Sequence, residues 1–250
     1  MPKLKRLLPR PTRMASASAA QASAPLEEPA TGAVNNTLRA YQEIRRQILA
    51  DEMPAGSQHL EQDLAERLKM SRTPVREALI RLAEEKLVEI RPRHGVRVLP
   101  ISLKDMAEIY EVLTELEALA ARRAAESGLA PDELASLDAA VAAMDDALQK
   151  NDLIAWSQAD ADFHARLIAA GGNARLETAV RMCLDQVHRA RRYTLNLRPK
   201  PKTSNDDHRA VVAAIRARDA TRAHTIHHRH REQAGRLLLS LLSENGKTEV

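Results

Sequence analysis

One carboxylate and three imidazoles are spaced along the second half of the chain so that helices could bring them together. Asp160 and His164 lie four residues apart, so one helical face would present both. His208 leads an apolar stripe at helical spacing, and His230 shares a face with alanine, isoleucine and leucine. Together they would suit a divalent transition metal (Zn, Ni, Mn or Fe), with positions left open for water or a carboxylate ligand.

Any one of these histidines, taken alone, is more simply interpreted as a core residue that makes a hydrogen bond. Three inward histidines accompanied by Asp160 favour the metal site. The apolar pattern that carries them is helical throughout residues 103–243, where short connections separate six amphipathic segments. Helices of this length with short connections predict an antiparallel bundle.

A second group of residues, between positions 71 and 79, could bind DNA. Arg72 and Arg76 are four residues apart on a short helix for which Ser71 is the expected N-cap, and Pro74 is tolerated in its first turn. Two guanidinium groups on an N-terminal turn could reach guanine edges or phosphates in a major groove. For an isolated pair of arginines, a solvated helix face is an equally good interpretation.

The surrounding pattern predicts a winged helix-turn-helix. Apolar residues at helical spacing mark helices over residues 38–49 and 60–68, and a short gap joins the second to the arginine helix. Alternating residues at 87–91 and 96–98 predict two strands, which the basic turn at 92–95 connects.

These residues resemble the DNA-binding domain of GntR-type bacterial transcription regulators. The resemblance lies in Ser-Arg-Thr-Pro-Val-Arg-Glu-Ala-Leu at residues 71–79, in the Arg-Leu pair at 81–82, and in the His-Gly pair at 94–95. It implies that the recognition helix contacts DNA through Arg72, Thr73 and Arg76. It also implies that His94 and Gly95 form the wing tip, which enters a minor groove.

The second half resembles the FCD effector domain of FadR-type members of that family, through the motifs Asp-x-x-Phe-His at 160–164 and Asp-His-Arg-Ala-Val at 207–211. The resemblance implies four metal ligands, which are Asp160, His164, His208 and His230. Three further histidines are alternatives to His230 as the fourth ligand: His224, His227 and His228. Of these, His227 is the main rival because it lies near the same helical face.

The chain departs from the family pattern at Leu113. Many members have an arginine there, a few residues before the pair that is here Leu116-Glu117, and it helps to hold the effector's carboxylate. The arginines at positions 189, 191 and 192 are candidate substitutes, although a run of charges usually faces solvent.

Length and composition agree with two modest domains that share no disulfide. The chain has 250 residues, a net charge of +4 and a single cysteine, Cys183, which excludes an internal disulfide or a multi-cysteine metal cluster. Aromatic residues are only 2% of the total, which argues against a stacking surface for single-stranded nucleic acid. No apolar run approaches the length that spans a bilayer.

The expected boundaries follow from these patterns. Residues 1–34, basic and then rich in Ala, Ser and Pro, are expected to be a disordered arm, and Met14 is a second candidate start of translation. The DNA-binding domain is assigned to 35–99, a linker to 100–102, the effector and metal-binding bundle to 103–243, and a tail to 244–250.

The sequence therefore predicts a mainly α-helical, cytoplasmic transcription regulator, a repressor that binds an inverted-repeat duplex operator as a homodimer. A small-molecule effector, an organic acid, would act at the metal-containing pocket. Two alternatives stay open: a metal-dependent hydrolase, which would need a carboxylate base beside the ligands that the sequence does not reveal, and a DNA-binding protein with a purely structural metal.

Overall fold

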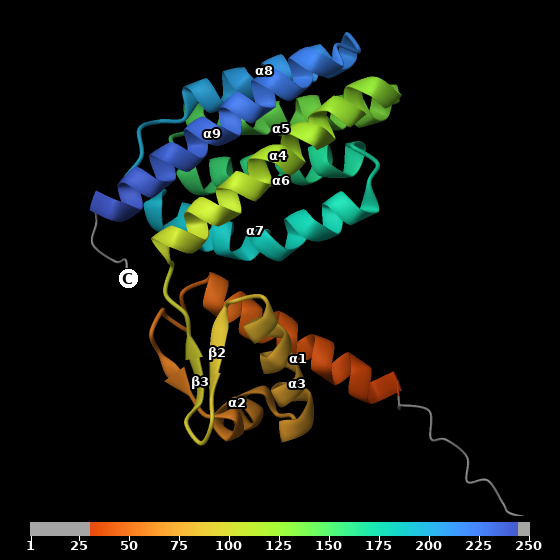
Figure 1. Ribbon diagram of the computed structural model, residues 1–250. Helices are drawn as coiled ribbons and strands as arrows, with labels where there is room; N and C mark the ends of the chain where they lie inside the picture. Colours follow the sequence, from red (N-terminus) through yellow and green to blue (C-terminus); the bar gives the residue numbers. More distant parts are fainter. Residues whose placement is uncertain (1–30, 245–250) are drawn as a thin grey trace, which may run out of the picture.

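The structure is a computed structural model that describes residues 31–244, with side chains from residue 35 onward. A winged helix-turn-helix lies beneath an all-α bundle (Figure 1). The expected fold class, mainly helical with an N-terminal winged helix, is confirmed. The elements of the first domain are α1 (Thr31–Leu49), β1 (Gln58–His59), α2 (Glu61–Leu68), α3 (Arg72–Glu84), β2 (Val88–Arg91) and β3 (Gly95–Val98).

The winged helix is built around a small aliphatic core. Val75, Leu79 and Leu82 recur along one side of α3 and are fully buried, so burial of this stripe seats the helix and leaves its other side free. The strands form an antiparallel sheet in the order β1-β3-β2, with Val88 paired to Val98 and Arg91 to Gly95.

Three details differ from the sequence-based expectations. Helix α1 spans Thr31–Leu49 and so extends further toward the N-terminus than the expected 38–49. Ser71 occupies the N-cap position of α3, but its side chain makes no capping hydrogen bond. The two-residue strand β1 was not expected, since it is too short to show alternation. Of the arm expected at 1–34, residues 31–34 belong to helix α1 instead, and residues 1–30, Met14 included, lie outside the described residues. Of the tail expected at 244–250, Glu244 ends α9 and residues 245–250 lie outside the described residues.

The bundle contains the six expected helices. Ser102 caps the first by accepting a hydrogen bond from the Asp105 backbone N–H at 3.2 Å, and Asp152 caps the third in the same way from Ala155 at 2.9 Å. The helix before the last begins at Lys202, directly after Pro201. The six helices are α4 (Leu103–Ser127), α5 (Pro131–Gln149), α6 (Leu153–Ala170), α7 (Ala174–Thr194), α8 (Lys202–Arg216) and α9 (Ala220–Glu244).

Helices α4 and α9 pack closely along the bundle (Figure 1). A Cβ placed on Gly235 of α9 would lie 2.8 Å from the ring of Tyr110 on α4, so a larger residue there would push the helices apart. None of the described helices is long and apolar enough to cross a membrane.

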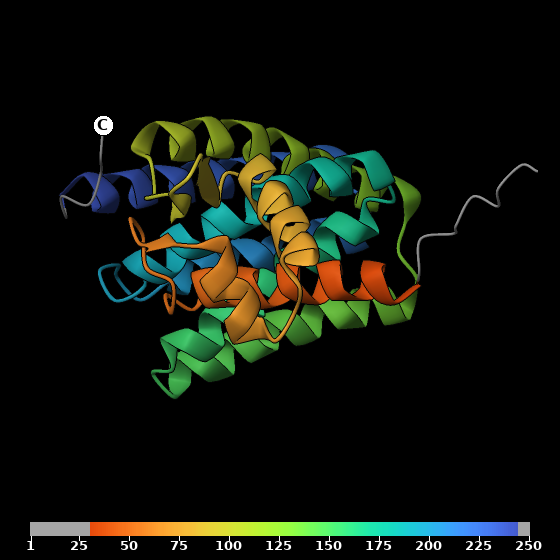
Figure 2. The same cartoon turned by 90° about the horizontal axis from the view of Figure 1, so that it is seen from below.

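The two domains meet where α7 faces α1. Figure 2, seen from below, shows α1 and α3 crossing beneath the bundle. Arg45 on α1 makes a two-pronged ion pair with Asp185 on α7. Gln186 donates a hydrogen bond to the Glu85 carbonyl at 3.2 Å, and Arg189 donates one to the Leu99 carbonyl at 3.0 Å. Polar bonds from α7 therefore hold this interface.

Candidate metal centre and nucleic-acid interface

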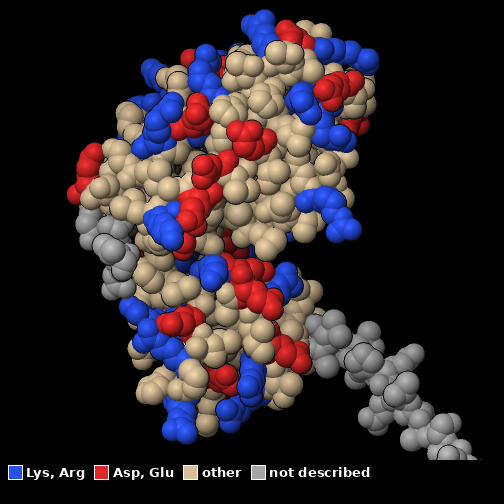
Figure 3. Space-filling view, in the orientation of Figure 1, with Lys and Arg blue, Asp and Glu red and all other residues tan. Residues whose placement is uncertain are grey.

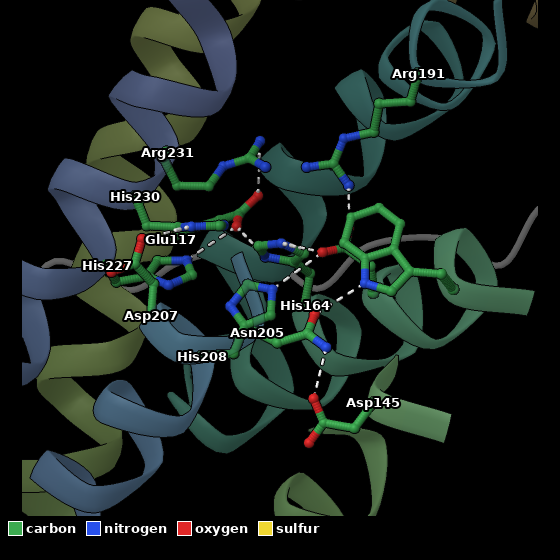
Figure 4. Close-up of polar contacts among 12 residues, drawn as sticks. Glu117, Asp145, His164, Arg191, Asn205, Asp207, His208, His227, His230 and Arg231 are labelled. Atoms are coloured by element: carbon green, nitrogen blue, oxygen red, sulfur yellow. Dashed lines mark hydrogen bonds and ion pairs between the residues drawn. The ribbon is translucent and has the colours of Figure 1, made fainter. Parts of the chain in front are cut away.

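The four residues expected to bind metal come together inside the bundle, and Figure 4 shows the rings of His164, His208 and His230 beside one another. Asp160 and His164 project from α6, His208 from α8 and His230 from α9, and all four are buried. One ring nitrogen from each histidine lies within 4.8 Å of the other two. Asp160 Oδ1 lies 3.0 Å from His208 Nε2 and 3.7 Å from His164 Nε2. Ligand atoms that share one ion at about 2.1 Å are separated by roughly 3.0 to 3.4 Å, so Asp160 and His208 already have the spacing of two ligands, and the other histidines would move slightly inward around an ion.

A second donor group adjoins the first and shares His164. It adds His227, which is fully buried, and Glu117 on α4. Glu117 Oε2 lies 2.8 Å from His164 Nδ1 and 3.2 Å from His227 Nε2. The sequence-based analysis missed Glu117, although its position four residues after Leu113 on the apolar face of α4 could have indicated that it points inward.

Each carboxylate of the cluster is held by an arginine, of which Arg231 is buried and Arg191 is half-buried. Arg191 Nη1 on α7 lies 2.6 Å from Asp160 Oδ2, and Arg231 Nη2 on α9 lies 3.4 Å from Glu117 Oε1. The ring of Tyr110 lies between them, 4.9 Å from the Arg231 guanidinium, and its hydroxyl accepts a hydrogen bond from Arg191 at 3.4 Å. Arg191 thus points into the site rather than to solvent, as its role as a candidate substitute for the missing arginine requires.

Arg191 and Arg231 supply the positive charge that an arginine at position 113 would supply in the family pattern. Leu113 is fully buried in the aliphatic core, whereas Arg231, only 1% exposed, reaches the pocket from the opposite helix. The sequence-based analysis missed Arg231. Its position four residues after His227, which was recognised as near the inward face, was the available signal.

The protonation states favour metal binding. Burial is the main reason that the pKa values of His208, His227 and His230 each fall to about 4, so their rings are neutral near pH 7. Burial by itself raises the pKa of Asp160, but the charge of Arg191 and the contacts with His164 and His208 together outweigh it and hold that pKa well below its ordinary value. Arg231 acts on the pKa of Glu117 in the same way. The cluster therefore offers neutral imidazoles and ionised carboxylates.

Unsatisfied ring nitrogens show that this donor set fits a metal. Both nitrogens of His164 and Nδ1 of His208 are buried without a hydrogen-bond partner among the described residues, and the approach of Glu117 to His164 is not aligned for a hydrogen bond. An unpaired buried polar atom costs about 1 to 3 kcal/mol, and an ion coordinated by one nitrogen of His164 would offset that cost for that atom. His230 Nδ1 lies 3.4 Å from Asp207 Oδ2, an outer carboxylate of the kind that orients a ligating imidazole.

A cavity of about 240 Å³ adjoins the cluster. Glu117, His164 and Arg231 form its inner wall, and residues of α6 and α7 form its sides. Its outer lining includes Arg45 and Leu49 of α1, so both domains contribute to it.

The residues expected to contact DNA lie on the outer side of the winged helix. Arg72, Thr73 and Arg76 are exposed on α3, and the Arg72 side chain is 69% exposed. Arg72 Nη2 lies 3.8 Å from Glu61 Oε2, a contact loose enough to be exchanged for a phosphate or a base. Figure 3 shows Lys and Arg side chains at the lower end of this domain, away from the bundle.

The wing tip presents His94 to solvent, while Gly95 has a structural reason to be glycine. His94 is exposed, and its Nδ1 lies 2.9 Å from the Pro92 carbonyl oxygen. Gly95 has φ +79°, and a Cβ there would lie 2.2 Å from the His59 carbonyl oxygen. The close pairing of β3 with β1 therefore requires glycine at this position.

Comparison with known proteins agrees with both halves of the structure. A model of the gntR family of bacterial regulatory proteins matches residues 36–98, and a model of the FCD domain matches residues 108–233. The chain belongs to the GntR family of bacterial regulators, in the branch that carries an FCD domain.

Individual relatives cover most of the chain. An uncharacterized HTH-type transcriptional regulator in the TAR-I ttuE-ttuC' intergenic region of Agrobacterium vitis is 39% identical over 165 residues, 64% of this chain and 96% of that protein. The HTH-type transcriptional repressor RspR of Escherichia coli K12 is 25% identical over 205 residues, 82% of this chain and 90% of its own. The E. coli McbR/YncC structure matches with a TM-score of 0.70 and 22% identity over 83% of this chain and 98% of that chain, which shows the shared fold.

The protein is thus a DNA-binding transcription regulator with an effector-binding FCD domain. The sequence revealed no carboxylate base beside the proposed ligands, which counted against a hydrolase. The structure corrects this point, because Glu117 lies beside them. However, Arg231 keeps Glu117 ionised with a strongly lowered pKa, which makes it a weak base for activating water.

Proposed function

We propose that this regulator is a cytoplasmic repressor that binds an inverted-repeat operator as a homodimer and responds to a small organic acid at a metal-organised pocket. The observation that carries the proposal is the pairing, in one chain, of exposed arginines on α3 with a buried cluster of histidines and carboxylates. The name of the relative RspR supports repression.

In the proposed complex, α3 lies in the major groove of the operator. Arg72 and Arg76 contact base edges or phosphates, and Thr73 adds a shorter polar contact. His94 enters the adjacent minor groove, with Gly95 allowing the turn that presents it. A two-fold axis through the dimer would place two such helices on the two halves of an inverted repeat.

In the bundle, Asp160, His164, His208 and His230 would hold one divalent transition metal, with Zn, Ni, Mn and Fe as candidates. The ion would supply positive charge and open positions for an oxygen ligand. Arg191 keeps Asp160 ionised, and Asp207 orients His230. Glu117 and His227 would lie beside this set, Glu117 being already paired with Arg231.

The contacts from α7 to the DNA-binding domain give a route for control. Helix α7 carries Arg191 at the pocket and Asp185 at the interface with Arg45. An effector that changes the position of α7 would therefore change how the winged helix is held. Linkage requires that effector and operator alter each other's affinity by the same factor.

A two-part experiment tests this function. Selection of bound fragments from genomic DNA would identify the operator, and fluorescence anisotropy would then measure its affinity for the metal-loaded protein with and without candidate organic acids. We expect a symmetric operator and an effector-dependent change of affinity. Selection of no specific sequence would refute operator binding, and an affinity that no acid changes would favour a purely structural metal.

A further inference from the structure

The cavity beside the histidine cluster has a cationic group at each end. At its inner end, the side chains of Arg231 and Glu117 are only 2% and 1% exposed. At its outer end, the Arg45 side chain is 39% exposed and that of Asp185 is 12% exposed. Burial therefore distinguishes a deep end beside the candidate metal ligands from a mouth beside the DNA-binding domain.

The charge of the lining favours an anionic ligand. Three guanidinium groups, those of Arg45, Arg191 and Arg231, line the cavity. Each pairs with one carboxylate, on Asp185, Asp160 and Glu117 respectively. A divalent ion bound by the neutral histidines would therefore make the site positive, and an anionic ligand that displaces Asp185 would leave Arg45 paired.

The volume limits the size of the ligand. A cavity of about 150 Å³ accepts benzene, so the 240 Å³ present here would hold on the order of ten non-hydrogen atoms. A chain of three to six carbons with two carboxylates fits that limit. Such a molecule carries one carboxylate for each end of the cavity, whereas a monocarboxylate could engage only one.

We propose that the cavity binds a small dicarboxylate whose inner carboxylate lies beside Arg231 and the metal ligands, and whose outer carboxylate binds Arg45 in competition with Asp185. This inference rests on the proposed function and adds the effector class. It also makes a residue of the winged helix part of the effector site. The ligand then acts directly on the domain interface, because the guanidinium it binds is the one that joins α1 to α7.

Calorimetric titration of the full-length, metal-loaded protein tests the proposal. The probes are dicarboxylates of three to six carbons, with and without hydroxyl groups, and monocarboxylates of the same lengths. We expect the best dicarboxylate to bind about tenfold or more tightly than its monocarboxylate counterpart, the effect of one additional charge-assisted hydrogen bond.

Two variants locate the outer contact. Arg45→Gln should bring the ratio of the two affinities close to one, whereas Asp185→Asn should strengthen dicarboxylate binding because the competing carboxylate is gone. Arg39→Gln is the matched control, since Arg39 is exposed on the same helix and does not line the cavity. Thermal melting verifies that each variant is folded.

Equal binding of the two classes, binding of neither, or a preference that survives in Arg45→Gln would overturn the inference. None of these results would refute the proposed function by itself. That function is judged on the same preparations by their metal content and by the effect of any bound acid on operator affinity.

Discussion

Arg191 Nη1 lies 2.6 Å from Asp160 Oδ2, so a side chain of α7 fixes the carboxylate that is the proposed metal ligand of α6. Tyr110 accepts a second hydrogen bond from the same guanidinium, which holds it in place from α4. Three helices thus determine the orientation of one carboxylate. This arrangement makes the metal affinity depend on a residue that is not itself a ligand.

Arg191→Gln should therefore weaken metal binding about 10- to 100-fold, the range typical of residues that orient ligands. Competition with a chromophoric chelator measures the effect. Arg192→Gln is the control, because Arg192 is the next residue but is exposed, and its side chain donates to the Ala50 carbonyl rather than to a residue of the cluster. Equal metal affinity in both variants would contradict the positioning role.

Replacement of individual histidines separates the two possible donor groups. His164→Ala and His208→Ala should lose the metal after dialysis, whereas His227→Ala should retain it if Asp160, His164, His208 and His230 are the ligands. Elemental analysis of the purified variants provides the measurement, with the half-buried His228→Ala as a control. Retention in His208→Ala combined with loss in His227→Ala would assign the site to the group that contains Glu117.

Arg72→Ala and Arg76→Ala should each weaken operator binding by on the order of 1 to 3 kcal/mol if they make bidentate base contacts. Anisotropy titrations give the affinities, and unchanged melting temperatures would show that the domain is intact. Arg166→Ala on α6 removes an exposed arginine far from α3 and should have no effect. Wild-type affinity in both α3 variants would rule out this recognition surface.

Gly95 and His94 should respond differently to alanine. Gly95→Ala should destabilise the protein by on the order of 1 to 3 kcal/mol, because the new Cβ would clash with the His59 carbonyl at a positive φ. His94→Ala should leave the free energy of unfolding nearly unchanged and weaken operator binding. Denaturant unfolding together with anisotropy distinguishes the two effects. A stable Gly95→Ala variant would show that β1 can move away from the wing.

Local patterns sufficed to predict most of the fold. The apolar stripes of the helices, the cap at Ser102 and the alternation in the wing are all encoded within a few neighbouring residues, as the structure shows. Strand β1 is defined only by its partner β3, which is distant in sequence, and so no local pattern marks it. The cap expected at Ser71 failed because residue type indicates that a cap is possible, not that its hydrogen bond forms.

The candidate site was predicted only in part, for a similar reason. The spacing of Asp160, His164, His208 and His230 could be recognised because histidines on apolar faces are unusual. Glu117, Arg191 and Arg231 look like ordinary surface charges in the sequence. Each of these charges can be buried only because it pairs with a charge of opposite sign: Arg191 with Asp160, and Arg231 with Glu117. The inward position of one partner therefore depends on that of the other.

The connection between β3 and α4 has a consequence for the operator. Strand β3 ends at Val98 and α4 begins at Leu103, so four residues, at most about 14 Å of chain, separate the wing from the bundle. With so short a linker, the winged helix-turn-helix domain must follow the movements of the bundle. In a dimer, the number of base pairs between half-sites would then be dictated by the bundle, and inserting half a helical turn into the operator should abolish simultaneous engagement of both halves.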